Sequence, residues 1–158
     1  MSKDLSIMVD ERRFNFRVGA IVECNNKVLL HKGIDKDYYN IPGGRCKIGE
    51  SSLNAVKREI EEEVGILEED YKLIYILENF FSENNLSTHE LLYIYTIVLP
   101  SNHPLYHKNE FATNDNKKEI NYWISKDEII NLKLKPDVLP HVINKKDLLI
   151  EHNIITRY

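Results

Sequence analysis

Apolar residues recur throughout the segment 14–32, and two consecutive asparagines, Asn25 and Asn26, stand near its middle. Asn tolerates a positive φ angle, so the pattern predicts two strands joined by a short hairpin turn at these two residues. The next segment, 38–44, reads as a short strand, and its proline and two glycines indicate that it ends in a turn.

From residue 51 to residue 64 the apolar positions change to a helical period. Leu53, Val56, Ile60 and Val64 fall within one sector at about 100° per residue, which predicts an amphipathic helix that buries this sector. A serine at its start suits the N-cap. The glycine that follows residue 64 suits the position just past the C-terminus, where a left-handed conformation favours glycine.

Two long β-rich runs follow, at 71–81 and 90–99, and a polar stretch at 82–89 joins them. We expect most of the aromatic residues in these runs to lie in the core. The stretch 100–119 has little periodicity, and loops of this length are usually functional lids or disordered.

The end of the chain alternates between strand and helix signals. Segment 119–124 predicts another strand, and Ser125–Glu128 has a capping-box pattern that predicts a short helix. A last helix is expected from Pro136 to roughly Leu148. The sequence contains no repeat or linker, so we predict one α/β domain over residues 1–158 with a mixed, mostly antiparallel sheet.

Composition narrows the class of protein. With 42% hydrophobic and 29% charged residues among 158, the chain fits a soluble globular protein. Frequent charges near the N-terminus argue against a secretory signal, and two cysteines are too few for a disulfide framework, which favours a reduced cytoplasmic protein. No apolar run is long enough to cross a membrane. A net charge of −4 argues against a nucleic-acid or membrane surface, although a divalent cation can link an acidic protein to an anionic substrate.

Three carboxylates share one face of the predicted helix, because Glu59, Glu62 and Glu63 are spaced by three and four residues. Such neighbours stand about 5–6 Å apart. Each pair repels by less than ~1 kcal/mol in water but by ~3 kcal/mol at an effective dielectric of 20. A partly buried cluster therefore calls for a cation, and carboxylate oxygens suit Mg²⁺ or Mn²⁺. The alternative is a solvated acidic face without metal, but flanking glycines and an arginine favour a site.

These residues belong to a longer pattern. Gly44 is followed after five residues by Glu50, and after seven more by the segment 58–66, which reads REIEEEVGI. This pattern resembles the box of the Nudix (MutT-like) hydrolase family at every specified position, from residue 44 to residue 66. The resemblance implies the family's α/β/α sandwich.

The resemblance also implies an activity: Mg²⁺- or Mn²⁺-dependent hydrolysis of a pyrophosphate bond in a nucleoside diphosphate linked to another group. A nucleoside triphosphate, ADP-ribose or another nucleotide sugar, and a dinucleotide all stay open as substrates, and no residue is assigned to substrate binding. Glu63 and Glu59 or Glu62 would ligate the metal together with the Gly43 carbonyl. Arg58 would orient these glutamates.

The general base is left open by the resemblance. In some family members Glu59 serves, and in others a glutamate beyond the box does, for which Glu90, Glu110 and Glu119 are candidates here. We favour Glu119 because it ends the long loop just before a strand. A homodimer is a further expectation from the family. The alternative function is a non-catalytic nucleotide sensor on the same scaffold.

Overall fold

The computed structural model describes residues 3–157. Its strands form one nine-stranded mixed sheet, and strand β2 (Arg12–Cys24) lies in the middle of that sheet. The other strands are β1 (Ser6–Val9), β3 (Lys27–Gly33), β4 (Gly43–Arg45), β5 (Lys72–Glu83), β6 (Leu86–Val98), β7 (Glu110–Ala112), β8 (Glu119–Ser125) and β9 (Glu151–Arg157). Their order is β7-β8-β3-β2-β6-β5-β9, and β1 and β4 also pair with β2. The pairs β2–β6 and β5–β9 are parallel and the other named pairs are antiparallel, which confirms the predicted mixed, mostly antiparallel sheet.

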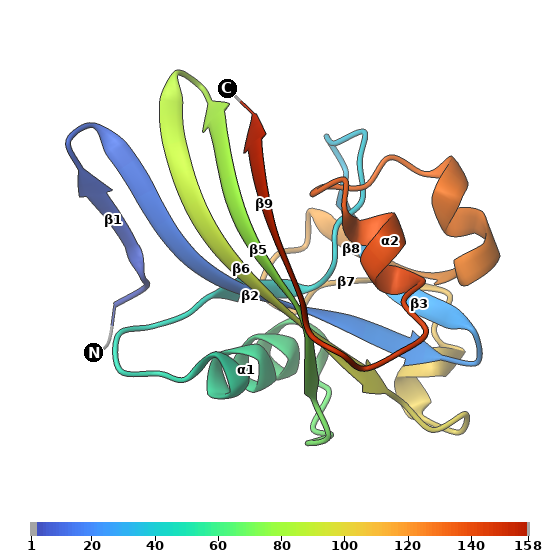
Figure 1. Ribbon diagram of the computed structural model, residues 1–158. Helices are drawn as coiled ribbons and strands as arrows, with labels where there is room; N and C mark the ends of the chain where they lie inside the picture. The colour runs from blue at the N-terminus through green and yellow to red at the C-terminus, as the bar shows by residue number, and fades with distance from the viewer. Residues whose placement is uncertain (1–2, 158) are drawn as a thin grey trace.

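Helices lie on both sides of this sheet, as in an α/β/α sandwich (Figure 1). Helix α1 (Ser52–Val64) packs against β2 and β4 on one side. Helix α2 (Leu139–Ile143) and the 3₁₀ helix η2 (Lys126–Asn131) contact one another on the other side, and a further 3₁₀ helix, η1, spans Pro104–His107. Each side has its own apolar core. Within the described part of the chain, no helix has the length and apolar character needed to cross a membrane.

Helix α1 begins and ends where the sequence predicted. The Ser51 hydroxyl accepts a hydrogen bond from the Asn54 amide at 3.1 Å, and Gly65 closes the helix with a φ of 74°. Val56, Ile60 and Val64 are buried as predicted, but Leu53 is 37% exposed, and Ala55 and Glu63 are buried in addition. The buried face of the helix therefore extends from the predicted apolar sector to the side that carries Glu63.

Two-residue asparagine turns join the long strand pairs. Asn25 and Asn26 adopt φ angles of 50° and 61°, which confirms the predicted hairpin. Asn84 and Asn85 adopt 52° and 62° between β5 and β6. The expected polar connection over 82–89 was therefore wrong in length, because both strands continue through its polar residues to a tight turn that positive φ angles permit.

Several other elements depart from the predictions. The two glycines expected to follow a short strand instead form β4, which pairs with β2. The stretch 100–119 contains η1 and β7 rather than one irregular loop. The capping-box serine, Ser125, opens a 3₁₀ helix, and its hydroxyl accepts from the Asp127 amide at 3.3 Å. The last helix is limited to α2, because the chain then extends and adds β9 to the edge of β5, where Ile155 packs against the core on the α2 side.

Candidate active site

Strand β4 brings the backbone of two glycines against helix α1. A Cβ atom on Gly44 would overlap the carboxylate of Glu59, and one on Gly43 would overlap the carbonyl of Val18 on β2. Because glycine has no side chain, β4 can approach both β2 and helix α1 this closely. The sequence therefore places Glu59 directly against the β4 backbone.

Arg58 connects the acidic residues of the helix with the loop before it. Its guanidinium donates to Glu50 through Nε at 2.7 Å and Nη2 at 3.0 Å, and to Glu59 through Nη1 at 2.8 Å. A longer contact of 3.3 Å reaches Glu62, whose side chain is 49% exposed, and Nη2 also donates to the Arg45 carbonyl at 3.0 Å. The guanidinium thus pairs with both Glu50 and Glu59, which fits an orienting role for Arg58.

Glu63 lies deepest among the acidic residues of α1. Its Oε2 accepts a hydrogen bond from the Gly43 amide at 3.2 Å, so Gly43 contacts it through the amide. Burial, together with the charges of Asp115, Glu59 and Glu119, raises the pKa of Glu63 to about 8. A carboxyl group in this position favours its protonated form unless a cation compensates its charge.

The loop before β8 closes the other side of the site. The Asn114 amide donates to the Glu63 carbonyl at 2.8 Å, which holds this loop next to the end of α1. Glu119 opens β8, and its Oε2 lies 3.7 Å from Nδ1 of His31 on β3. Burial, with the Arg17 charge adding, lowers the pKa of His31 to about 4, so its imidazole is neutral at neutral pH. Burial and Asp115 raise the pKa of Glu119.

The other two candidate bases lie elsewhere. Glu90 lies on β6, where it is buried beside Asn15 of β2. Because side chains alternate along a strand, Glu90 is on the same side of the sheet as Leu92, which is the side opposite α1. Glu110 is exposed on β7. Of the three candidates, the structure therefore brings Glu119 to the acidic residues of α1.

Two residues of this site were missing from the sequence analysis. Asp115 raises the pKa values of Glu63 and Glu119, and His31 faces Glu119. Asp115 lies in a polar stretch without periodicity, and His31 continues a strand of apolar residues. Neither has a local signal, since only the folded topology brings them to the helix.

A comparison with known protein families shows to which family this chain belongs. The model of the NUDIX domain matches residues 13–145, which is most of the chain. The chain belongs to the Nudix family. The predicted family resemblance and the predicted sandwich fold are both confirmed.

Solved MutT structures have the same fold as this Nudix chain. A MutT protein from Bacillus halodurans has a TM-score of 0.68 at 23% identity, with 90% of each chain covered. A MutT Nudix hydrolase from Burkholderia pseudomallei has a TM-score of 0.66 at 21% identity, covering 85% of this chain and 98% of that one.

Two curated relatives match shorter segments of the Nudix chain. An 8-oxo-dGTP diphosphatase of Escherichia coli is 31% identical over 80 residues, which is 48% of this chain and 62% of the relative. An RNA pyrophosphohydrolase of Ruthia magnifica is 35% identical over 60 residues, which is 37% of this chain and 34% of the relative. The chain thus spans less than two thirds of either relative's length.

The acidic residues of the Nudix box fit a hard divalent cation by their chemistry. No group of three or more acidic, histidine or cysteine side chains within residues 3–157 converges as a ready metal site. The reason is visible in the contacts, because Arg58 holds Glu59 and Glu62 while the Gly43 amide holds Glu63. Burial raises the pKa values of Glu59 and Glu63, and neighbouring carboxylates add to this, Glu62 for Glu59 and Glu59 for Glu63, so a cation would relieve an excess of negative charge.

Proposed function

We propose that this Nudix protein hydrolyses a pyrophosphate bond in a nucleoside diphosphate linked to another group, using Mg²⁺ or Mn²⁺. The observation that carries the proposal is Glu63, a buried carboxyl group facing Glu59 and the glycine backbone of β4. A sensor without catalysis would not need all the acidic residues of the box, and every one of them is present. We therefore favour the enzyme over the sensor.

Glu59, Glu62 and Glu63 would hold the metal, together with the Gly43 carbonyl. The metal would supply positive charge to offset that of the phosphoanhydride. Arg58 positions the Glu59 carboxylate by its contact of 2.8 Å and keeps Glu50 from competing for the same place. Arg17 supports the proposal as well, since it is exposed on β2 and its charge lowers the pKa values of both His31 and Glu119, so its guanidinium is close enough to these residues to meet an anionic substrate.

Glu119 is our proposed general base, because the raised pKa of its carboxyl group and its place beside the acidic helix suit proton abstraction from water. Replacing Glu119 with Gln is expected to lower kcat by roughly 10²–10⁴-fold, the usual loss when a general base is removed. Glu110→Gln is the matched control, since Glu110 is exposed on β7. Steady-state kinetics measure kcat for both variants. Equal kcat values for the Glu119 and Glu110 variants would show that another residue is the general base.

A substrate panel tests the function itself. The panel contains 8-oxo-dGTP and ordinary nucleoside triphosphates, RNA with a 5′-triphosphate, ADP-ribose and other nucleotide sugars, and dinucleotide polyphosphates. Mass spectrometry of the products in Mg²⁺ or Mn²⁺ identifies the leaving group and the phosphorus attacked. Nucleotide-dependent thermal stabilisation without turnover of any substrate would favour the sensor instead.

The surroundings of the enzyme are part of the same proposal. Cys24 and Cys46 are buried and free, which supports a reducing compartment such as the cytoplasm. The net charge of −4 supports a small nucleotide bound through a cation, rather than a nucleic-acid or membrane surface, as the partner.

A further inference from the structure

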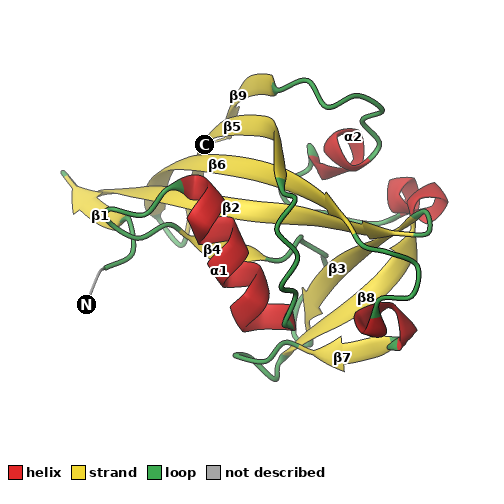
Figure 2. Ribbon diagram, turned by 90° about the horizontal axis from the view of Figure 1, so that it is seen from below, coloured by secondary structure: helices red, strands yellow, loops and turns green. Residues whose placement is uncertain are grey.

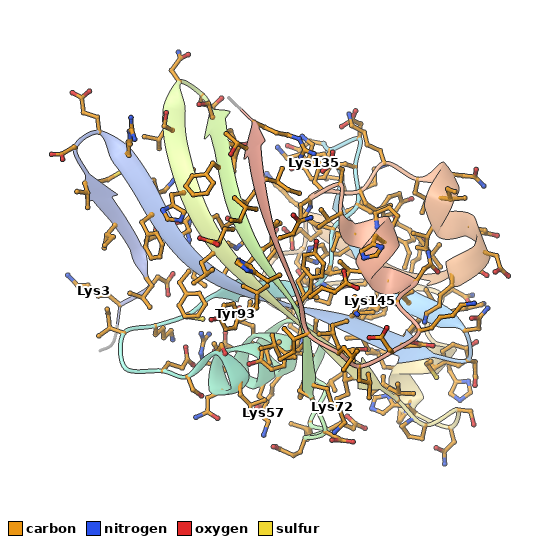
Figure 3. All side chains as sticks on the ribbon, in the orientation of Figure 1. Lys3, Lys57, Lys72, Tyr93, Lys135 and Lys145 are labelled. Atoms are coloured by element: carbon orange, nitrogen blue, oxygen red, sulfur yellow. The ribbon has the colours of Figure 1, made fainter. Side chains whose placement is uncertain are left out.

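Four polar side chains lie together on the side of the sheet opposite α1, where Figure 1 shows no helix over the strands. Strand register pairs Asn15 of β2 with Glu90 of β6, and Arg13 with Thr88 beside them. Tyr93, labelled in Figure 3, packs against the core on the α1 side, and Glu90 points to the other side of the same strand. Figure 2 shows α1 in front of β2, so these four residues, which we call the polar row, lie behind the sheet in that view.

The polar row is buried, but several of its polar atoms have no hydrogen-bond partner. Asn15 is 5%, Thr88 1% and Glu90 7% exposed. The Oδ1 atom of Asn15, the Oγ1 atom of Thr88 and the Nε atom of Arg13 are shielded from solvent and find no partner among residues 3–157. A buried polar atom without a partner destabilises the fold. Three such atoms in neighbouring positions therefore indicate that the row serves a ligand.

Arginine side chains surround Glu90 without pairing with it. Burial raises the pKa of Glu90. The Asn15 side chain and the charges of three nearby arginines oppose this rise, and these are Arg13, Arg17 and Arg45. Within the described part of the chain, none of the three side chains forms an ion pair. Long side chains that no partner holds can move aside and donate to oxygen atoms of a ligand.

Arg17 connects the polar row with the proposed active site. Its charge lowers the pKa values of both Glu90 and Glu119, so its guanidinium lies within electrostatic reach of both carboxyl groups. The register partner of Gly44 on β2 is three residues from Asn15, which is about 10 Å along the strand. A nucleoside held at the polar row can therefore direct its phosphates toward the acidic face of α1.

The chemistry of the polar row matches a guanine base. Guanine presents two neighbouring donors, N1–H and the 2-amino group, and the two oxygens of a carboxylate can accept from both. The other bases present one donor group at this edge, and arginine donates to O6 and N7 of guanine. Phe81 of β5, the register partner of Thr88, is half-buried and offers a ring for stacking. It is an exception to the expectation that most aromatic residues of these strands lie in the core.

We propose that the polar row recognises the guanine base of the substrate, with Glu90 accepting hydrogen bonds from N1–H and the 2-amino group. Asn15 and Thr88 contact the remaining polar atoms of the base, and Arg17 meets the phosphates. This inference rests on the proposed function and narrows the open substrates to guanine nucleotides. Base recognition is measured without hydrolysis, so the two proposals can fail separately.

Isothermal titration calorimetry with GMP, IMP and AMP in Mg²⁺ tests base recognition, because none of the three contains a pyrophosphate bond. IMP differs from GMP only in lacking the 2-amino group. GMP is expected to bind at least about tenfold more tightly than IMP or AMP, because either of these leaves a buried oxygen of Glu90 without a donor. Equal affinities for the three nucleotides, or no binding at about 1 mM, would overturn the proposal.

Glu90→Gln keeps the size of the side chain but removes one acceptor oxygen, so it should lower the affinity for GMP at least about tenfold. The weaker binding of IMP should stay nearly unchanged. Glu78→Gln is the matched control, because Glu78 lies on the α1 side of β5, where it pairs with His152 at 2.7 Å. GMP binding that survives Glu90→Gln would place base recognition elsewhere and overturn the proposal.

Thr88→Val separates ligand binding from packing. Valine has a similar shape but no hydroxyl, so removal of this unpartnered oxygen should leave Tm unchanged or raise it. The same variant should weaken GMP binding about threefold or more. Wild-type affinity, or a lower Tm in circular dichroism melts, would show that the hydroxyl serves the fold and would contradict its proposed role. Selective GMP binding without turnover of any substrate in the panel would support base recognition and contradict hydrolysis alone.

Discussion

Replacing Glu63 with Gln is expected to lower the rate of pyrophosphate hydrolysis by about 10³-fold, because a lost metal ligand removes several kcal/mol of transition-state stabilisation. The fold should survive, since the amide oxygen of Gln can still accept the hydrogen bond from the Gly43 amide. Initial rates on the best substrate of the panel, with Mg²⁺ varied, measure the loss.

Glu61→Gln is the control for this variant. Glu61 lies on the same helix but is exposed, so its replacement should change the rate by less than about threefold. Full activity of the Glu63 variant, or unaltered turnover of the wild type in excess chelator, would defeat the metal mechanism.

The stability of the metal-free protein is expected to fall as the pH rises from 6.5 to 8. Glu63 has a folded pKa of about 8, above its ordinary value of 4.5, so the folded state binds a proton that the unfolded chain releases. Stability from such a group is complete below the unfolded pKa and is lost as the pH rises through the folded pKa. Over this window the free energy of unfolding should decrease by about 1–2 kcal/mol, as urea titrations can measure.

The window is chosen to separate Glu63 from His31. Burial lowers the pKa of His31 to about 4, so that residue destabilises the protein only as the pH falls below its ordinary value of 6.5. Saturating Mg²⁺ should remove the decrease and raise Tm, because the cation stabilises the ionised carboxylate. Glu63→Gln should also flatten the pH dependence, whereas Glu61→Gln should not. A metal-free protein whose stability stays constant over this window would contradict the assigned burial of Glu63.

Local signals were enough to predict helix α1 and the hairpin between β2 and β3. The asparagine pair at 25–26 and the serine and glycine around α1 act through their own backbone preferences, so the hairpin and the helix limits were correct. Strand β9 was not predicted, because its place depends on parallel pairing with β5, more than seventy residues earlier in the chain. Such long-range pairing has no signature in a short window of sequence.

For the candidate site as well, the sequence predicted local spacing but not long-range packing. The spacing of the box placed Glu59 and Glu63 on one helix face, but it did not reveal that the helix turns this face toward the sheet. The burial of Glu63 depends on β4, whose glycines let the helix approach, and the position of Asp115 depends on the Asn114 amide contact with the helix end. Both are properties of packing between segments that lie far apart in sequence.

The close approach at Gly44 limits how this protein can vary. Even the methyl group of alanine would occupy the space of the Glu59 carboxylate, so no other amino acid fits at position 44 without displacing that side chain. The neighbouring Arg45 offers its carbonyl to Arg58, and a carbonyl is common to all residue types. Position 44 is therefore expected to stay glycine during evolution. Position 45 is expected to tolerate substitution, because its contact with Arg58 uses a backbone atom that every residue type has.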